Sequence, residues 1–198
     1  MSALTRRGLL GLAGMGMAWP TFAQSAPPRV TLASSLGAIE IELAADKAPI
    51  SVANFLAYVD QKRLDGASFY RALKLSADLS SGLIQGGLQG DPAKVLAPIA
   101  HEPTTKTGLR HLNGTISLAR DAPGTATCDF FICVGEQPSL DADPAQSGDN
   151  LGYAAFGQVV AGMHVVKKIL GSPVSPTKGP FTNEMLDPSV PILTVRRG

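Results

Sequence analysis

The chain has 198 residues, of which 44% are hydrophobic and 17% charged, which is enough to bury one core of ordinary size. Its formal net charge is +1 and its acidic and basic residues are interspersed, so neither nucleic acid nor an anionic membrane surface is an expected partner. The 21 glycines and 15 prolines indicate many turns and favour β-structure over helix.

Residues 1–23 have the pattern of an export signal. The basic pair Arg6-Arg7 precedes an apolar stretch, and Thr21-Phe22-Ala23 supplies the small residues that a signal peptidase reads. The apolar stretch is too short to span a membrane, and no second one follows. We therefore expect cleavage near Ala23 and a single periplasmic domain over residues 24–198. The arginine pair favours the twin-arginine route, while the general secretory route with a chance pair stays open.

The next elements are predicted from periodicity. Residues 29–43 alternate between apolar and polar on either side of a short turn, which is typical of a β-hairpin. The chain from Asp46 onward places Pro49 near a first helical turn and then repeats apolar residues at helical spacing, as in Val52, Phe55 and Val59. A second short helix is predicted over residues 162–170.

Further strands are predicted where short apolar runs lie between turn residues. These runs are 67–72, 82–86, 114–119, 129–134, 154–160 and 190–196. Together with the hairpin they make eight closely spaced strands, which favour a closed barrel because closure removes free edges. The remaining stretches are rich in Pro, Gly and Asp and are interpreted as loops: 88–113, 141–152 and 172–189.

Neither a disulfide nor a metal site is expected. Cys128 and Cys133 flank four residues of one predicted strand, so their Cα atoms should lie roughly 16 Å apart, far beyond disulfide reach. The three histidines, His101, His111 and His164, lack ligand spacing. A nucleophilic Cys–His pair is a weaker alternative, because Cys133 in FFICV has the surroundings of a buried packing thiol.

Two polar side chains in strand-like runs indicate a binding site. Arg71 follows two aromatic residues in FYR, and Gln85 lies between an apolar pair and two glycines in LIQGG. No acidic residue lies inside either run. On this stretch alone, the simpler interpretation is that Arg71 extends to solvent and Gln85 caps a turn.

Five segments in order and spacing resemble the cyclophilin-type peptidyl-prolyl isomerases of the exported bacterial branch. They are GASFYR, LIQGG, NGTISLAR, DFFICVG and LGYAAFGQVVAGMHVVKKI, and the resemblance covers residues 29–197. It implies a mainly β fold, a closed eight-stranded antiparallel barrel with two capping helices. It also implies no metal and no organic cofactor. The expected partners are proline-containing polypeptides or unfolded exported proteins, bound by a monomer.

The resemblance assigns the polar residues of the site. Arg71 would be catalytic, Gln85 would hydrogen-bond the substrate backbone, and the Tyr153 hydroxyl would reach a substrate carbonyl. Rotation about an X-Pro bond needs no nucleophile, only a donor that favours the twisted amide, and the barrier is about 18–20 kcal/mol. A guanidinium suits this task because it is always charged and presents rigid donors.

The resemblance also assigns an apolar pocket for the proline ring. Phe131 would form its floor and Leu83 and Leu140 its walls, while Ala119 and the Arg120 backbone would line the substrate groove. The alternative interpretation is that Phe131 and Leu83 belong to the barrel core, since alternate strand residues face inward.

Several positions depart from the family pattern beside this pocket. The connection through residues 73–81 is longer than usual, and Gly82 stands where the family has an aromatic residue. One wall of the pocket would then be open unless Leu79 from the longer loop fills it. Ser139 likewise replaces the usual aromatic residue before Leu140.

Asp129 is a further departure, because it replaces a glutamine. It could pair with Arg71 across strands and either orient the guanidinium or compete with substrate for it. Two functions therefore remain open. The first is an isomerase that accelerates folding of exported proteins. The second is a peptide-binding or chaperone module with the same fold and little or no turnover.

Overall fold

The computed structural model describes residues 26–145 and 147–198. The predicted export segment, residues 1–23, lies outside the described residues. The strands are β1 (Arg29–Ser34), β2 (Gly37–Leu43), β3 (Ser68–Lys74), β4 (Gly82–Gly87), β5 (Thr115–Leu118), β6 (Phe130–Val134), β7 (Ala154–Ala161), β8 (Val174–Ser175) and β9 (Met185–Arg197). The helices are α1 (Pro49–Asp60), α2 (Thr104–Thr107), α3 (Met163–Leu170) and the 3-10 turn η1 (Pro138–Leu140).

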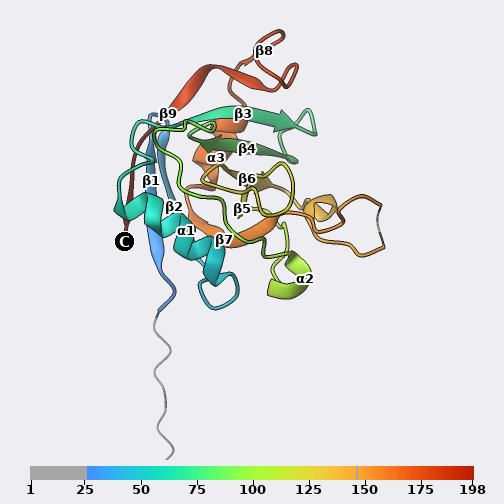
Figure 1. Cartoon of the computed structure of the whole chain (residues 1–198). Helices are drawn as coiled ribbons and strands as arrows, with labels where there is room; N and C mark the ends of the chain where they lie inside the picture. Colours follow the sequence, from blue (N-terminus) through green and yellow to red (C-terminus); the bar gives the residue numbers. More distant parts are fainter. Residues whose placement is uncertain (1–25, 146) are drawn as a thin grey trace, which may run out of the picture.

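Eight of these strands form a closed antiparallel barrel, as the sequence predicts (Figure 1). Their order is β1-β2-β7-β5-β6-β4-β3-β9, and pairing between β1 and β9 closes the ring. The two-residue strand β8 is added outside the ring, on β9. Residues 172–189 were predicted to be loop, and this is wrong in part: β8 lies here, and β9 begins at Met185 because this residue pairs with Arg71 of β3.

The helices α1 and α3 match the two predicted helices. Helix α1 packs against β7 and β9, and α3 packs against β2, β3, β4 and β6. A third helix, α2, lies within the predicted loop 88–113. Just before it, the buried Glu102 accepts hydrogen bonds from the backbone N–H groups of Ile50 and Ser51, which ties this loop to the first turn of α1.

The barrel interior contains a cluster of aromatic rings. Phe130 makes edge-to-face contacts with Phe55 of α1 and Phe69 of β3, with ring centroids 5.8 and 5.9 Å apart. Because strand side chains alternate between faces, the neighbouring Phe131 lies on the outer face of β6. This alternation separates the barrel core from the site described below.

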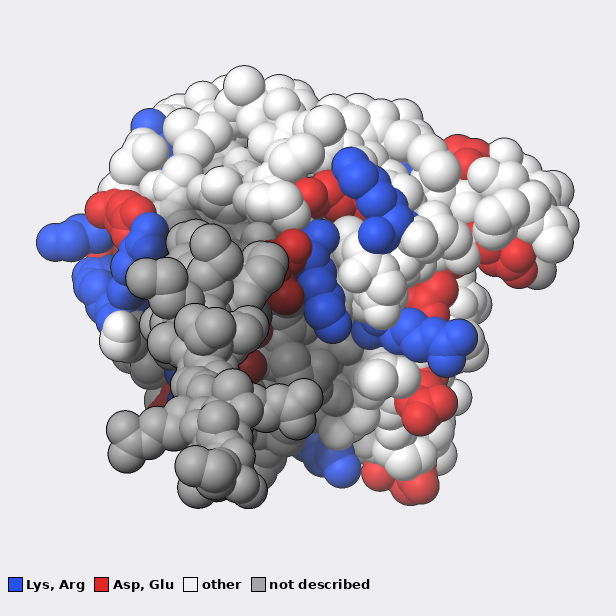
Figure 2. Space-filling view, turned by 90° about the horizontal axis from the view of Figure 1, so that it is seen from below, with Lys and Arg blue, Asp and Glu red and all other residues white. Residues whose placement is uncertain are grey.

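Charges of both signs are mixed on the protein surface. On the face shown in Figure 2, Lys and Arg side chains lie beside Asp and Glu side chains instead of gathering in one field. Ion pairs of the protein surface include Arg197 with Asp60 at 2.6 Å and Arg196 with Asp65 at 2.7 Å. In residues 26–145 and 147–198, no helix is both long and apolar enough to cross a membrane.

Candidate active site

A β-bulge in β3 places two polar side chains on one face. Phe69 pairs with Gly86 and Arg71 pairs with Gln85, so Tyr70 is the additional residue on its strand. Phe69 and Ala72 on either side are fully buried in the core. Tyr70 and Arg71 therefore lie together on the outer face, next to Gln85 of β4.

The guanidinium of Arg71 is held by three neighbours. Its Nε–H donates to Glu184 Oε2 at 2.6 Å, its Nη2 lies 2.6 Å from the same oxygen, and its Nη1–H donates to Gln85 Oε1 at 3.0 Å. The ring of Phe181 lies against one face of the guanidinium, 3.8 Å from Cζ to the centroid. The Arg71 side chain remains 18% exposed. It therefore does not extend freely into solvent.

Gln85 connects Arg71 to a further pair. Its Nε2 donates to the Tyr70 hydroxyl at 2.7 Å, and that hydroxyl donates to Asp129 Oδ2 at 3.1 Å. Burial and the adjacent carboxylate of Asp129 raise the pKa of Tyr70 well above its usual range, so the hydroxyl keeps its proton. The amide of Gln85 is thus oriented, with its oxygen toward Arg71.

Asp129 does not pair with Arg71, so the predicted cross-strand pair is wrong. Its Oδ1 accepts hydrogen bonds from the backbone N–H groups of Leu88 and Gln89, at 2.7 and 3.1 Å. The carboxylate lies against Gly87, where an added Cβ would be 2.1 Å from Oδ1. The second glycine of LIQGG therefore leaves room for Asp129, whose other oxygen is engaged by Tyr70.

A cavity of about 560 Å³ opens beside Arg71 and brings the predicted site residues together. Its lining includes all of the predicted catalytic and substrate-binding residues, namely Arg71, Leu83, Gln85, Ala119, Arg120, Phe131, Leu140 and Tyr153. Phe131 and Leu83 form a second buried cluster with Cys133, separate from the barrel core. The interpretation of Phe131 and Leu83 as core residues is therefore wrong.

Gly82 does not leave the pocket wall open, contrary to the prediction. A Cβ on Gly82 would lie 2.3 Å from the Leu73 carbonyl oxygen and 3.2 Å from the Leu170 side chain, so this position faces α3. The cavity is lined instead by Leu73, which pairs with Leu83 across β3 and β4. Leu79 does not fill the pocket either, because it packs against the barrel core.

The opposite rim of the cavity is organised by Arg120. Its Nε and Nη2 donate to the Gly152 carbonyl oxygen, at 2.9 and 2.6 Å, and its terminal nitrogens bind both oxygens of Asp149. This interaction lowers the pKa of Asp149 to about 2. The Tyr153 ring lies 5.3 Å from the Arg120 Cζ and meets Phe131 edge-to-face at 5.3 Å. Ser139 is exposed on η1, next to this rim.

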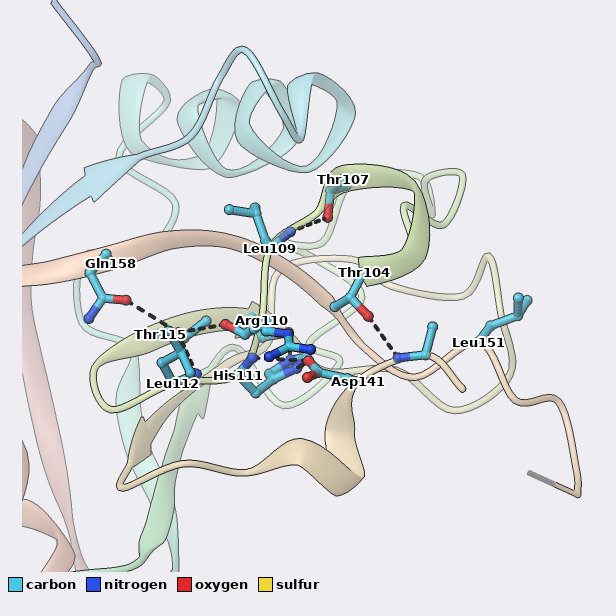
Figure 3. Close-up of polar contacts among 12 residues, drawn as sticks. Thr104, Thr107, Leu109, Arg110, His111, Leu112, Thr115, Asp141, Leu151 and Gln158 are labelled. Atoms are coloured by element: carbon cyan, nitrogen blue, oxygen red, sulfur yellow. Dashed lines mark hydrogen bonds and ion pairs between the residues drawn. The ribbon is translucent and has the colours of Figure 1, made fainter. Parts of the chain in front are cut away.

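A buried polar network contacts the aromatic floor of the pocket. The His111 ring stacks on Phe131, with centroids 5.7 Å apart and an interplanar angle of 17°. In its neutral form His111 donates from Nδ1 to Asp141 at 2.6 Å (Figure 3), and its Nε2 accepts a hydrogen bond from the Ser117 hydroxyl at 2.9 Å. Asp141 directly follows Leu140, so one network fixes both the floor and a wall of the pocket.

The two cysteines are free thiols inside the protein. Both are buried, and burial raises the pKa of Cys128 to about 11 and of Cys133 to about 12. Cys128 lies before β6, not inside one strand with Cys133 as predicted. Both ring nitrogens of His111 are engaged by Asp141 and Ser117, so a Cys–His nucleophile is not formed there.

Four residues that contact Arg71 or Gln85, or that line the pocket wall, are not predicted from the sequence. Leu73 and Tyr70 could have been found, because Leu73 lies two positions after Arg71 and Tyr70 precedes it. Phe181 and Glu184 follow Arg71 by more than a hundred residues, within a predicted loop. No local pattern links them to β3, and only the pairing of β9 with β3 brings them there.

Comparison with known proteins gives consistent matches. The family profile described as "Cyclophilin type peptidyl-prolyl cis-trans isomerase/CLD" matches residues 29–196. The chain is 37% identical to peptidyl-prolyl cis-trans isomerase A of Dickeya dadantii, over 88% of this chain and 85% of that protein. It is 39% identical to a peptidyl-prolyl cis-trans isomerase of Acinetobacter baylyi, over 84% of each chain.

Solved structures match in fold at lower identity. A cyclophilin-type isomerase of Cryptosporidium parvum has a TM-score of 0.68 and 19% identity, over 87% of this chain and 98% of that one. The same protein in the presence of the dipeptide Ala-Pro has a TM-score of 0.67 and 20% identity, over 86% and 98%.

Proposed function

Because this chain belongs to the cyclophilin-type peptidyl-prolyl cis-trans isomerase family, it is an isomerase of X-Pro bonds, and we propose that Arg71 is its catalytic residue. One observation carries the assignment. The Arg71 guanidinium lines the same cavity as the apolar cluster around Phe131 and Leu83. A permanent donor thus stands beside a surface that fits a proline ring.

The reaction needs only such a pair of features. Rotation about the X-Pro amide removes its resonance, and the nitrogen gains a lone pair that a hydrogen-bond donor stabilises. Phe131, Leu83, Leu140 and Leu73 would hold the ring by apolar contact. The N–H groups of Arg71 would then stabilise the twisted amide more than the planar one, which is the condition for lowering the barrier.

The remaining rim residues would hold the substrate backbone. We assign this role to Gln85, Ala119, the Arg120 backbone and the Tyr153 hydroxyl, because all four positions line the cavity. Gln85 already uses its oxygen for Arg71, so its Nε2 is the group that would reach a substrate carbonyl.

A protease-coupled assay on an X-Pro peptide tests this function. We expect wild type to accelerate cis-to-trans conversion and Arg71→Ala to lose most of the acceleration while binding the peptide. A folded Arg71→Ala protein that is as fast as wild type would refute the role of Arg71. A different result is that wild type and Arg71→Ala both bind the peptide but neither accelerates its conversion above the uncatalysed rate. The chain would then act as a peptide-binding module.

We further propose that the substrates are exported proteins folding in the periplasm. The basic pair, apolar stretch and Thr21-Phe22-Ala23 site at the start of the chain support this location. Cell fractionation followed by N-terminal sequencing would test it, with a mature chain starting near residue 24 as the expected result. Retention of the intact chain in the cytoplasm would contradict it. Export that survives Arg6→Lys with Arg7→Lys would assign the general secretory route.

A further inference from the structure

The segment that precedes β9 covers the guanidinium of the proposed catalytic residue. Glu184 contacts the Nε edge of the Arg71 guanidinium, and the Phe181 ring lies against its planar face. The segment is fixed at this point, because the backbone N–H of Ala72 donates to the Glu184 carbonyl oxygen at 2.8 Å. Ala72, the residue after Arg71, is therefore hydrogen-bonded to the main chain of Glu184, the ion-pair partner of Arg71.

We propose that Glu184 is a positioning residue for Arg71, and this inference rests on the proposed function. An arginine side chain has several rotatable bonds, and catalysis requires its donors to stand at one place relative to the proline ring. Glu184 holds the Nε–Nη2 edge, Gln85 holds Nη1, and Phe181 restricts one face. Together they confine the guanidinium to one plane and one direction.

The position of Glu184 favours positioning over competition with substrate. Arg71, Gln85 and Phe181 line the cavity, whereas Glu184 is not among its lining residues. The carboxylate therefore contacts the guanidinium outside the cavity in which the substrate would bind. Glu184 engages Nε–H and contacts Nη2, and Gln85 accepts one N–H of Nη1, so each terminal nitrogen, which carries two hydrogens, keeps one N–H donor for a substrate.

Removing Glu184 should affect turnover more than binding. In Glu184→Ala the guanidinium loses the contact that fixes its Nε edge, and a small displacement of a catalytic group is costly. We expect kcat to fall about tenfold or more, with KM within about twofold of wild type. Glu184→Gln keeps an acceptor without the charge and should fall between Glu184→Ala and wild type.

A double-mutant cycle shows whether Glu184 acts through Arg71. In the Arg71→Ala background, adding Glu184→Ala should cause no further loss of kcat/KM, since the residue being positioned is absent. The matched control is Glu42→Ala, which breaks the exposed Arg29–Glu42 pair away from the cavity and should leave kcat within about twofold. Thermal unfolding of each variant separates loss of fold from loss of position.

Three results would overturn the inference. The first is a kcat of Glu184→Ala equal to that of wild type, and the second is a higher kcat, which would show that Glu184 competes with substrate. The third is a double mutant in which the losses of kcat/KM from the two substitutions add. Failure of the proposed function can be told apart from failure of this inference. In that case the single variant Arg71→Ala would have the same kcat/KM as wild type.

Discussion

Phe131 is the residue on which the pocket depends most. Its ring stacks on His111, meets Tyr153 in an edge-to-face contact and contributes to the cavity lining. It is 4% exposed although it points away from the barrel core. Phe131 is preorganised by these neighbours, so under the proposed pocket assignment a proline ring would bind without first ordering the pocket floor.

Phe131→Ala should empty the floor of the pocket. We expect KM for an X-Pro peptide to rise about tenfold or more, because the proline ring of the peptide loses the apolar surface that the Phe131 side chain provides. The free energy of unfolding should fall by about 3 kcal/mol, since a buried aromatic residue is truncated. Kinetics and urea unfolding measure the two effects. Phe131→Leu should show smaller losses in both, and unchanged KM in the alanine variant would contradict the pocket assignment.

At the scale of single elements, β4 shows how far the sequence alone reaches. LIQGG identifies a strand, and the resemblance assigns Gln85 and Leu83 their places in the site. The sequence could not show that Gly82 faces α3, because this depends on how β4 packs against a helix that lies about eighty residues later in the chain. Glu184 was likewise out of reach, since its contact with Arg71 depends on the pairing of distant strands.

Gly87→Ala tests the packing at the end of β4. The new methyl group would overlap the Asp129 carboxylate and approach its Cα to 2.8 Å, so the carboxylate would be displaced. The matched control is Gly66→Ala, which also has positive φ, +77°, but has nothing within 4 Å of the new Cβ. The control should cost about 1 kcal/mol from backbone strain alone.

Gly87→Ala should lower the free energy of unfolding in urea by about 2 kcal/mol more than this control, because it adds the overlap with Asp129 and a less accessible φ of +140°. Equal losses in the two variants would show that Asp129 moves aside freely.

For the whole molecule, the barrel was predictable because its strands are short, alternating and closely spaced. Closure by β1 and β9, which lie at opposite ends of the described chain, follows from the strand count and the need to remove edges. Residues 172–189 were less predictable, because a Pro- and Gly-rich composition does not show that Met185 already pairs with β3. The same composition hid α2 in residues 88–113.

The stability of the whole protein should depend on pH through His111. Burial lowers the pKa of this imidazole below its ordinary value of 6.5, although Asp141 acts in the opposite direction. Below pH 6.5 the unfolded chain therefore binds a proton that the folded protein does not yet bind. The free energy of unfolding should be highest above pH 6.5 and fall as the pH falls below it.

Urea unfolding between pH 7.5 and 5.5 would measure this dependence, and His111→Gln should flatten it. A wild-type free energy of unfolding that rises on acidification over this range would show that the pKa of His111 is raised instead.

The most direct test of the central claim is kcat/KM of Arg71→Lys in the protease-coupled assay, with urea unfolding of the same protein. Lysine keeps the charge but replaces the planar fork with a single flexible ammonium group, which cannot satisfy Glu184, Gln85 and the twisted amide together. We predict a loss of about 2–3 kcal/mol in transition-state stabilisation, with the free energy of unfolding within about 0.5 kcal/mol of wild type. A folded Arg71→Lys protein with the kcat/KM of wild type would contradict the account.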